Sequence, residues 1–401
     1  MKILILGIDG YIGYSLALHL LKQGHTVFGL DNSSRRRRVH SVGGDSLTPI
    51  KTMMERDAYL QHVFNNYGGM WTHTLGVDRH SALYRLLVEC EPDTIVHLAE
   101  QPSAPYSMKG IQYAYSTQME NILGTLQLLW IMYEVCPEAH LVKLGTMGEY
   151  GTPNCVIPEG RVPKECLHQE FELVDFSGSY GSAVKGSCPM SGLLFPRTPG
   201  SFYHLTKVHD TFNIEFACRT WELRSTDIMQ GVVYGLNDAN GEDEFTRFDY
   251  DECFGTVINR FCTEAISGHP LTVYGAGGQT RGYLPLKDSI QCLTIAIENP
   301  AKSGEYRTLN QFAKTFSINQ LAAMVFDIAE DMNLKPKIDH ILNPRVEAEE
   351  HYYNPDHRKL SNLGYEPTIN HLNEIRKLIE QLLPYKDFIR KDLLMPKITW
   401  T

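Results

Sequence analysis

The sequence has no closely spaced pair of cysteines. Its nine cysteines, among 401 residues, are scattered singly, and none forms a Cys-x-x-Cys pair. This pattern excludes a zinc-binding cysteine cluster and argues against a disulfide framework, because both need cysteines at paired spacings. We therefore expect free thiols in a reducing compartment, the cytoplasm, and no bound metal.

Positive charge is also scarce. Lysine and arginine number 37 against 47 acidic residues, which leaves a net charge of −10. A broad nucleic-acid surface needs clustered cations that neutralise phosphates, so nucleic acid is not an expected partner. The one dense basic run is Arg35–Arg38.

No apolar run is long enough to cross a bilayer. The longest, Ile122–Val135, contains Gly124, Gln127 and Glu134 and is typical of a buried helix. The chain opens directly on a strand-like run, so we expect neither a signal peptide nor a transit peptide. The sequence predicts a protein that is not inserted in a membrane.

What the sequence does contain is a regular alternation of strand and helix patterns. Short apolar runs typical of buried parallel strands occupy Lys2–Leu6, Thr26–Leu30, Thr94–Leu98, Leu141–Leu144 and Ser225–Gln230. Helical patterns separate them at Tyr11–Lys22, Ser81–Cys90, Ala114–Cys136 and Tyr203–Thr220. This alternation predicts an α/β fold with a doubly wound parallel sheet of the Rossmann type.

The same pattern suggests two domains. We expect a dinucleotide-binding domain over residues 1–231, with a Gly-, Ser- and Pro-rich flap at about 152–201. From residue 232 to 401 the pattern loosens into shorter elements. This part is expected to form mainly a smaller C-terminal substrate-binding domain, with some segments returning to the first domain.

A glycine-rich turn connects the first strand to the first helix. It reads Gly7-Ile-Asp-Gly10-Tyr11-Ile12-Gly13. Glycines in this position allow a tight turn and close backbone approach, and the helix N-terminus favours the charge of a pyrophosphate. The turn therefore predicts a dinucleotide cofactor.

Asp31 at the end of the second strand indicates which dinucleotide is bound. A carboxylate there accepts hydrogen bonds from the ribose hydroxyls of NAD and repels the extra phosphate of NADP. Arg35–Arg38 could reverse this preference by pairing with that phosphate. We favour NAD because Asp31 holds the nearer position, and we expect the arginines to form a solvated basic loop in which one member stacks on the adenine.

The clearest catalytic signal is Tyr203-His-Leu-Thr-Lys207. Residues four apart share one face of a helix, so Tyr203 and Lys207 should point into one site. The ammonium group should lower the pKa of the tyrosine, which could then take a proton from a sugar hydroxyl while a hydride leaves. Thr146, just after the strand that ends at Leu144, can bond the reacting oxygen.

The order of the glycine turn, Thr146, Tyr203 and Lys207 resembles the extended short-chain dehydrogenase/reductase family, which includes nucleotide-sugar epimerases and 4,6-dehydratases. Supporting motifs cover the chain: His97-Leu-Ala99, Asn121-x-x-Gly-Thr125, Gln230 near Tyr234-Gly235, Gly278-Gln-Thr-Arg281 with Asp288, and Asn343-Pro-Arg345 before Leu363-Gly364.

The resemblance implies a set of binding residues. NAD would contact Gly7, Gly10, Tyr11, Ile12, Gly13, Asp31, Asn32, Arg35, Arg36, Asp78, Arg79, Leu98, Ala99, Glu100, Asn121, Tyr203, Lys207, Gln230 and Val233. The sugar nucleotide would contact Gln101, Ser103, Tyr106, Thr146, Gln230, Arg260, Gln279, Arg281 and Arg345. In the family, arginines equivalent to Arg281 and Arg345 hold the diphosphate of the substrate.

Four longer stretches narrow the resemblance. Residues 144–151, 201–207, 230–235 and 343–353 resemble a branch of the family that converts UDP-glucose and sulfite to a sulfonated sugar nucleotide through 4-keto intermediates, with NAD recycled. The product would supply a lipid or a glycan. Members of this branch carry an arginine where this chain has Pro102, so the charge that meets sulfite would have to come from elsewhere.

Two further residues are candidates for the later acid–base steps. A 4,6-dehydratase of the family has Asp-Glu directly after the catalytic threonine, but this chain has Met147 and Gly148 there. Glu149 and His204 could exchange protons instead. Equally, Glu149 could make a structural hydrogen bond and His204 could be a packed helix residue.

The resemblance also implies a homodimer, paired through Ala114–Cys136 and Tyr203–Thr220. The apolar residues of these helices would suit a monomer core as well. Two alternative functions stay open: another NAD-dependent UDP-sugar epimerase or dehydratase, and a non-catalytic relative that binds nucleotides or associates with RNA. The intact Thr146, Tyr203 and Lys207 set and the acidic net charge count against the last.

Overall fold

The computed structural model describes residues 1–72, 81–162, 194–345 and 352–400. A seven-stranded sheet in the order β11-β7-β5-β4-β1-β2-β3 forms its centre. All neighbouring strands in it run parallel. Its strands are β1 (Lys2–Leu6), β2 (Thr26–Asp31), β3 (Tyr67–Thr72), β4 (Thr94–His97), β5 (His140–Thr146), β7 (Arg224–Gln230) and β11 (Tyr306–Gln311). This order confirms the predicted doubly wound fold.

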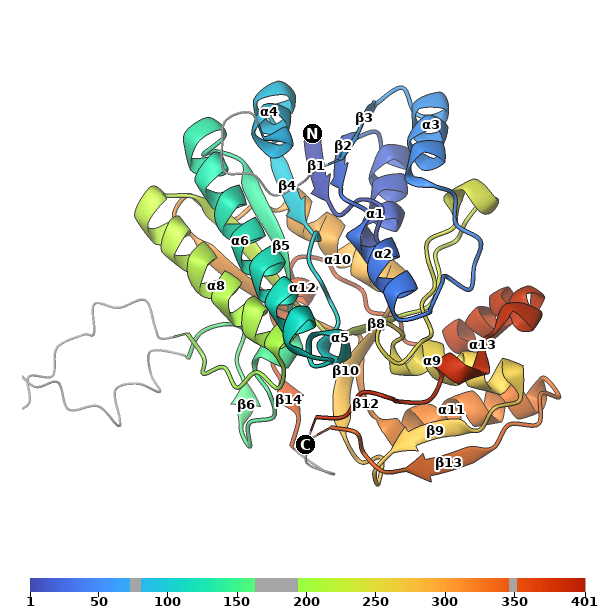
Figure 1. Ribbon diagram of the computed structural model, residues 1–401. Coiled ribbons are helices and arrows are strands. Elements are labelled where there is room, and N and C mark those ends of the chain that lie inside the picture. The colour runs from blue at the N-terminus through green and yellow to red at the C-terminus, as the bar shows by residue number, and fades with distance from the viewer. Residues whose placement is uncertain (73–80, 163–193, 346–351, 401) are drawn as a thin grey trace, which may run out of the picture.

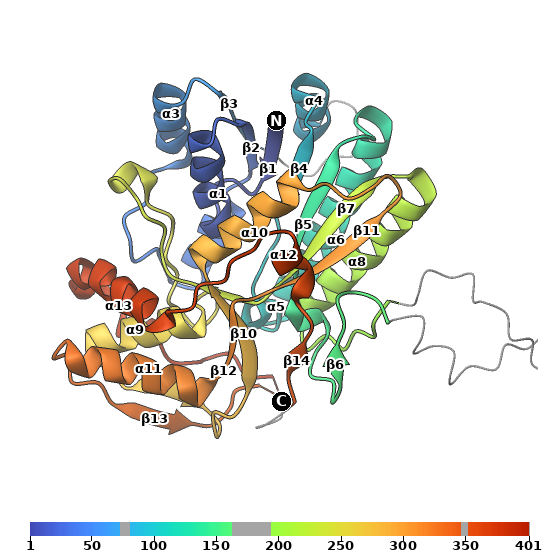
Figure 2. The ribbon, with the colours of Figure 1, turned by 180° about the vertical axis from the view of Figure 1, so that it is seen from behind.

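Helices cover both faces of the sheet, because a parallel sheet is apolar on both sides. One face packs on α4 (Ala82–Cys90), α6 (Ile111–Val135) and α8 (Phe202–Trp221). The other packs on α1 (Tyr11–Lys22), α3 (Met53–Val63), α10 (Leu286–Glu298) and α12 (Arg358–Asn362). Helices α6 and α8 lie in front of the sheet in Figure 1, and α10 lies in front of it when the molecule is turned in Figure 2.

A second apolar core lies beside the first. It combines α9 (Val257–Ser267), α11 (Ile318–Asp331) and α13 (His371–Leu382) with the strand pair β9 (Leu271–Tyr274) and β13 (Ile338–Ile341). A three-stranded sheet joins the two cores: β12 (Lys314–Ser317), β10 (Thr280–Pro285) and β8 (Val232–Tyr234). After β10 the chain returns to the first core as α10 and β11, and it then returns to the second as β12 (Figure 1).

Shorter elements complete the described chain. They are α2 (Ser34–Ser41), α5 (Ala104–Ser107), the 3-10 helices η1 (Met147–Glu149), η2 (Glu242–Glu244), η3 (Leu383–Phe388) and η4 (Lys391–Leu393), and the strand pair β6 (Val156–Ile157) with β14 (Asn354–Pro355). Of the expected flap, only residues 152–162 and 194–201 fall within the described residues.

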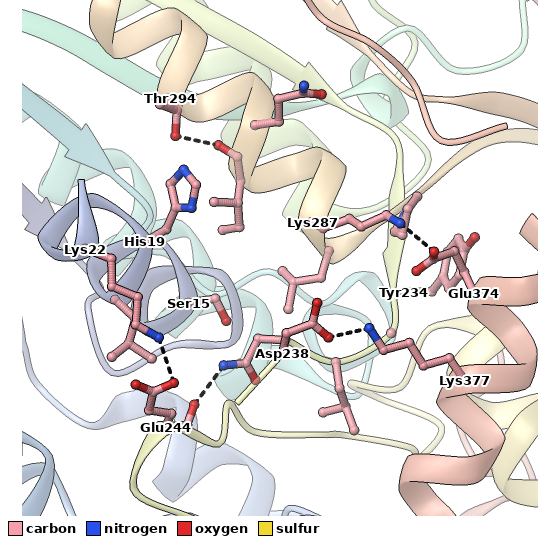
Figure 3. A pocket seen from close by; sticks show the side chains of 18 of the residues that line it. Ser15, His19, Lys22, Tyr234, Asp238, Glu244, Lys287, Thr294, Glu374 and Lys377 are labelled. Atoms are coloured by element: carbon pink, nitrogen blue, oxygen red, sulfur yellow. Dashed lines mark hydrogen bonds and ion pairs between the residues drawn. The ribbon is translucent and has the colours of Figure 1, made fainter. Parts of the chain in front are cut away.

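A groove of about 550 Å³ marks the junction of the two cores. It lies between α1, α10, α13 and the loop after β8 (Figure 3). Three ion pairs neutralise its lysines, namely Lys22–Glu244, Lys287–Glu374 and Lys377–Asp238. These ion pairs connect segments far apart in sequence, so they help to hold the two cores together.

The arginine run does not form the expected solvated loop. It lies in α2, where Arg35 pairs with Asp249 at 2.5 Å, Arg36 pairs with Asp9 at 2.5 Å and Arg38 pairs with Glu120. The carboxylates come from segments that only the tertiary fold brings to α2. None of the described helices is both long and apolar enough to cross a membrane.

Candidate active site

The glycine turn lies where the carboxyl ends of β1 and β4 meet, and β1 pairs with β4 on one side and β2 on the other. Gly7 has a φ of 87°, and a Cβ there would lie 2.9 Å from the backbone nitrogen of Ala99 and the carbonyl carbon of Leu98. A Cβ on Gly13 would lie 3.0 Å from the carbonyl carbon of Gly7 and closer still to its oxygen. The turn therefore needs glycine at both positions, and it leaves a cradle that fits a dinucleotide pyrophosphate.

Asp31 is fixed beside this turn. Its carboxylate accepts hydrogen bonds from the backbone N–H of Asp9 at 3.0 Å and of Ser33 at 2.7 Å. Burial and then the nearby Asp9 raise the pKa of Asp31 to about 6. Asn32 Oδ1 accepts a hydrogen bond from Ser34 N–H just before α2. The position of Asp31 suits a ribose hydroxyl donor.

The two arginines expected at the cofactor are held by carboxylates. Arg36 donates twice to Asp9 and once to the carbonyl of Lys51. Arg35 donates to Asp249, and its guanidinium lies 4.1 Å from the ring centroid of Phe254. In this structure Arg35 stacks on Phe254.

The catalytic trio comes together as its spacing predicts. Tyr203 and Lys207 lie on the buried face of α8, with the Lys207 Nζ 5.9 Å from the tyrosine ring centroid. Thr146 ends β5, and its side chain hydrogen-bonds Tyr203, which lowers the pKa of the tyrosine. Tyr203 is 8 % exposed. The phenol is therefore held by two elements at the edge of the sheet.

The expected lowering of the Tyr203 pKa by Lys207 is wrong for this structure. Burial and then the charge of Glu100 raise the pKa of Tyr203. The ammonium of Lys207 lies 2.6 Å from the Glu100 carboxylate and donates to the carbonyl of Leu144 at 2.6 Å. Because the Glu100 carboxylate offsets the charge of Lys207, this ammonium contributes little to stabilising a Tyr203 phenolate.

Several residues expected to touch ligands instead support the loop after β4. Glu100 pairs with Lys207, and Asn121 exchanges hydrogen bonds with the backbone of Gln101 and donates to Thr206. The side chain of Gln101 bonds Ser103 and Thr117, and Ser103 donates to the carbonyl of Cys253. Each is buried, with its polar atoms directed at the protein. Their role in this structure is to hold the loop.

Four more expected contacts are packed into the protein. Tyr11 donates its hydroxyl hydrogen to the carbonyl of Gly235 at 2.6 Å. Val233 belongs to the first apolar core, and Tyr106 packs edge-on to Tyr113. Ile12 packs against the first core and is only partly buried. These side chains join the cofactor turn and the loop after β4 to their surroundings.

His204 lies directly beside the catalytic trio. Its Nδ1 is 3.1 Å from Ser201 Oγ, and its imidazole fills the space over Gly148, where a Cβ would lie 2.6 Å from His204 Cδ2. Burial and then the charges of Arg345 and Arg281 lower its pKa to about 4. A neutral imidazole can accept a proton. In a dehydratase of the family, the second acid stands at the position of Gly148. Here the imidazole of His204 occupies the space that a side chain at this position would take.

Glu149 faces the interior. Its side chain is fully buried, 3.1 Å from Arg197 Nε, and accepts a hydrogen bond from Thr211 at 3.0 Å. Burial and then the neighbouring Asp227 raise its pKa to about 7. Glu149 has no exposed atom in this structure, and its part in proton transfer stays a prediction.

Arg281 and Arg345 lie near His204, and Arg260 lies near Arg345. Burial lowers the pKa of Arg345, and the charges of Arg260 and Arg281 lower it further. Arg260 is already neutralised by Glu264 and bonded to the carbonyl of Thr272, which the sequence did not indicate. Such a cluster is costly unless an anion is bound, so Arg281 and Arg345 fit a diphosphate.

Orphaned polar atoms line the same region. Buried side-chain atoms without a hydrogen-bond partner include Gln230 Oε1, Gln279 Oε1, Asn343 Nδ2 and Arg345 Nε. Buried polar groups are normally bonded, so these atoms fit a polar ligand. The described residues contain no group of histidine, cysteine and acidic side chains that could hold a metal.

Two predicted cofactor contacts lie outside the described residues, and two charged residues near the catalytic trio were not predicted. Asp78 and Arg79 fall in the undescribed range 73–80. Lys143 and Asp210 form a buried ion pair behind Lys207. A lysine within an otherwise apolar strand, and an aspartate three residues after Lys207, were the signals available in the sequence.

A sequence profile of the NAD dependent epimerase/dehydratase family matches residues 3–310. The chain is 43 % identical to the chloroplastic UDP-sulfoquinovose synthase of Spinacia oleracea, over 100 % of this chain and 79 % of that protein. It is also 43 % identical to the UDP-sulfoquinovose synthase of Sulfolobus acidocaldarius, over 100 % of this chain and 98 % of that protein.

Solved structures share the fold at low identity. A UDP-glucuronic acid 4-epimerase variant from Bacillus cereus, in complex with NAD and a fluorinated UDP-sugar, has a TM-score of 0.67 at 19 % identity, covering 95 % of this chain and 99 % of that one. A UDP-glucose 4-epimerase from Thermotoga maritima with UDP-glucose has a TM-score of 0.65 at 19 % identity, covering 97 % and 100 %.

Proposed function

The chain belongs to the NAD dependent epimerase/dehydratase family, and on that basis we propose that it is a UDP-sulfoquinovose synthase, an enzyme that forms UDP-sulfoquinovose from UDP-glucose and sulfite. The observation that carries this proposal is 43 % identity along the entire chain to two enzymes of that name, one from a plant and one from an archaeon. Identity at this level over the full length favours this reaction over the alternative epimerase or dehydratase functions.

NAD is the proposed cofactor, and the residues present fit it. The glycine cradle at Gly7 and Gly13 admits a pyrophosphate, and Asp31 is placed for a ribose hydroxyl. NAD, when bound, supplies an acceptor that takes a hydride from C4 of the sugar and later returns it. Arg36 is held by Asp9, so it is not free to bind the additional phosphate of NADP.

UDP-glucose is the proposed substrate. Arg281 and Arg345 would bind its diphosphate, because two buried cations lie together there. Gln279 and Gln230 each offer a buried oxygen without a partner to hydroxyl or amide donors of the ligand. His204 lies between these arginines and the Tyr203–Lys207 pair, so the sugar would extend across it.

The side chains then divide the proton transfers. Tyr203, as its phenolate and with Thr146 bonded to it, accepts the proton of the C4 hydroxyl as the hydride leaves C4. The ketone at C4 acidifies the C5 hydrogen, and neutral His204 accepts that proton and returns it to the departing C6 hydroxyl, which leaves as water. The sulfur of sulfite adds to C6, and C5 regains a proton from solvent. The hydride returns to C4 and Tyr203 returns its proton, so no net oxidation occurs.

The test is mass spectrometry of the purified protein after incubation with UDP-glucose, NAD and sulfite, beside a reaction without sulfite. We expect a sulfite-dependent UDP-sulfoquinovose peak that is lost in Tyr203→Phe. Such a peak would also show that Pro102 is compatible with sulfite addition. Conversion of UDP-glucose without sulfite to UDP-galactose or a stable 4-keto sugar would instead favour the epimerase or dehydratase alternative, and NAD binding without turnover would favour a non-catalytic relative.

We also propose a homodimer formed through α6 and α8. Both helices expose large apolar side chains on the side away from the sheet: Ile111, Tyr115, Met119, Leu123, Leu126, Trp130 and Tyr133 on α6, and Phe202, Phe212 and Phe216 on α8. An exposed apolar surface of this kind is typical of a protein interface. In light scattering, Leu126→Glu should give monomers, whereas the matched control Leu342→Glu, at an exposed leucine elsewhere, should not. A wild-type monomer would refute the dimer.

The cytoplasm remains the proposed compartment. The cysteines among the described residues are free thiols, which suits a reducing environment. The spinach relative is named as chloroplastic, so the compartment is to be tested by fractionation of cells that contain the protein.

A further inference from the structure

Four charged side chains lie together behind the catalytic tyrosine. Glu100, Lys143, Lys207 and Asp210, the charge quartet, have side-chain exposures of 3 %, 0 %, 6 % and 0 %. Lys207 Nζ is 2.6 Å from Glu100 Oε2, Glu100 Oε1 is 3.9 Å from Lys143 Nζ, and Lys143 Nζ is 3.2 Å from Asp210 Oδ2. Positive and negative groups alternate along this path, and with all four ionised the quartet has no net charge.

Three elements supply the quartet. Glu100 follows β4, Lys143 lies within β5, and Lys207 and Asp210 are three apart on α8 and so share a face. Strands β4 and β5 pair in register, with His97 opposite Lys143. The relative placement of the charges is therefore fixed by the sheet and by α8, and not by flexible surface side chains.

Stability alone does not explain such a group. A buried ion pair recovers in attraction about what it loses in desolvation, and well-packed apolar side chains commonly do as well. Every other residue of the strand segment Leu141–Leu144 is apolar, so Lys143 is the exception in it. The first two members of the path, Lys207 and Glu100, border Tyr203, and this points to a role in the reaction.

We propose that Glu100 and Lys143 are positioning residues that govern how readily Tyr203 gives up its proton. Glu100 offsets the charge of Lys207 and thereby opposes the phenolate. Lys143 offsets Glu100 and thereby favours the phenolate. This inference rests on the proposed function, in which Tyr203 exchanges the proton of the C4 hydroxyl.

Glu100 and Lys143 shift the pKa of Tyr203 in opposite directions. After burial, Glu100 is the main influence that raises the pKa of Tyr203, and Lys143 lowers it. Glu149 raises the pKa of Tyr203 as well. Opposite signs for Glu100 and Lys143 mean that neutralising them should have opposite effects.

The other groups that face the quartet are limited. His97 Nε2 lies 3.7 Å from Glu100 Oε1, and burial lowers the His97 pKa to about 4, so this ring is neutral near neutral pH. Asp227 on β7 and Glu149 on η1 face Lys143 and favour its charged form. The pKa of Glu100 is lowered to about 2, because Lys207 and Lys143 outweigh burial.

The experiment compares the pH dependence of kcat/KM for Glu100→Gln and Lys143→Met with that of the wild type. Each variant rate is divided by the wild-type rate at the same pH, which cancels the titration of sulfite itself. Because the accessible pH values lie below the Tyr203 pKa, the Glu100→Gln ratio should lie above one and the Lys143→Met ratio below one at every pH, by roughly tenfold for a one-unit displacement of the Tyr203 pKa. The double variant Glu100→Gln/Lys143→Met should return toward the wild-type profile.

Two controls separate positioning from folding. Lys143→Arg keeps the charge and should keep the wild-type pH profile, and NAD affinity measured by titration should be close to wild type in every variant. Should Lys143→Met fail to fold, Glu100→Gln and the charge-balanced double variant still carry the test. Ratios equal to one for both single variants, or ratios that lie on the same side of one for both, would overturn the inference. A wild-type protein without sulfite-dependent product would end the proposed function, and the inference with it, before any variant is compared.

Discussion

Replacing Gly148 by alanine should slow the reaction after oxidation of the sugar. The imidazole of His204 fills the space over Gly148, and a Cβ there would lie 2.6 Å from His204 Cδ2. Carbon atoms in contact are normally about 3.5–4.0 Å apart, so the overlap is about 1 Å. Because the neighbouring backbone belongs to η1 and the start of α8, we expect the imidazole to move.

The size of the effect on the rate follows from the free energy that the movement of the imidazole costs. Turning the ring away from its rotamer costs about 0.5–1.5 kcal/mol, and losing the hydrogen bond with Ser201 costs about 1 kcal/mol. A total of about 2 kcal/mol corresponds to about thirtyfold in the rate of the step that uses His204. Binding of NAD should not change, because His204 is not among the residues expected to contact it.

The assay measures UDP-sulfoquinovose formation and NAD affinity for Gly148→Ala beside Gly200→Ala. Gly200 is a matched control, because a Cβ at that position meets no atom within 4 Å and its backbone needs no special conformation. We expect turnover about thirtyfold lower in Gly148→Ala and unchanged in Gly200→Ala. Wild-type turnover in Gly148→Ala would refute the idea that His204 must occupy this position.

Further outcomes follow from the cofactor turn, a buried histidine and the arginine cluster. Gly13→Ala should lose NAD binding in a titration, since its Cβ would run into the carbonyl of Gly7, and wild-type affinity would contradict the cradle. Arg345→Met should raise the dissociation constant of UDP-glucose about tenfold or more while NAD affinity stays constant, and calorimetry distinguishes the two. Burial and then Arg307 lower the pKa of His140 to about 3, so the folded protein keeps this ring neutral. The unfolded chain takes up that proton near a pKa of about 6.5, and stability should therefore be greatest above about pH 6.5 and fall as pH decreases toward about 3. In urea unfolding, His140→Asn should show a smaller loss between about pH 7 and pH 5, and an equal loss would contradict this assignment.

Local spacing was sufficient for the core of the catalytic site. Tyr203 and Lys207 share a face because a helix has about 3.6 residues per turn. Thr146 reaches them because it ends β5, a strand of the sheet on which their helix α8 packs. The apolar runs became strands β1, β4, β5 and β7 within a few residues of the predicted bounds. Continuous apolar runs are what a strand covered on both faces requires.

The charges were less predictable. No local sequence pattern indicates that Arg36 pairs with Asp9, that Arg35 pairs with Asp249, or that Glu100 pairs with Lys207. The expected basic loop was wrong because the partners of these arginines lie elsewhere in the chain. The expected lowering of the Tyr203 pKa was wrong because the carboxylate of Glu100, which lies between β4 and α5, offsets the charge of Lys207.

The sequence by itself determined the layered fold, the glycine turn and the identity of the catalytic trio. These features depend on periodicity and on steric limits within one turn or one helix, which a linear pattern contains. The tertiary structure alone decided which charges are compensated, why His204 occupies the space over Gly148, and how Arg281 and Arg345 come to lie near each other. Electrostatic energy depends on distance and burial in three dimensions, and these distances are set by strand order and domain packing.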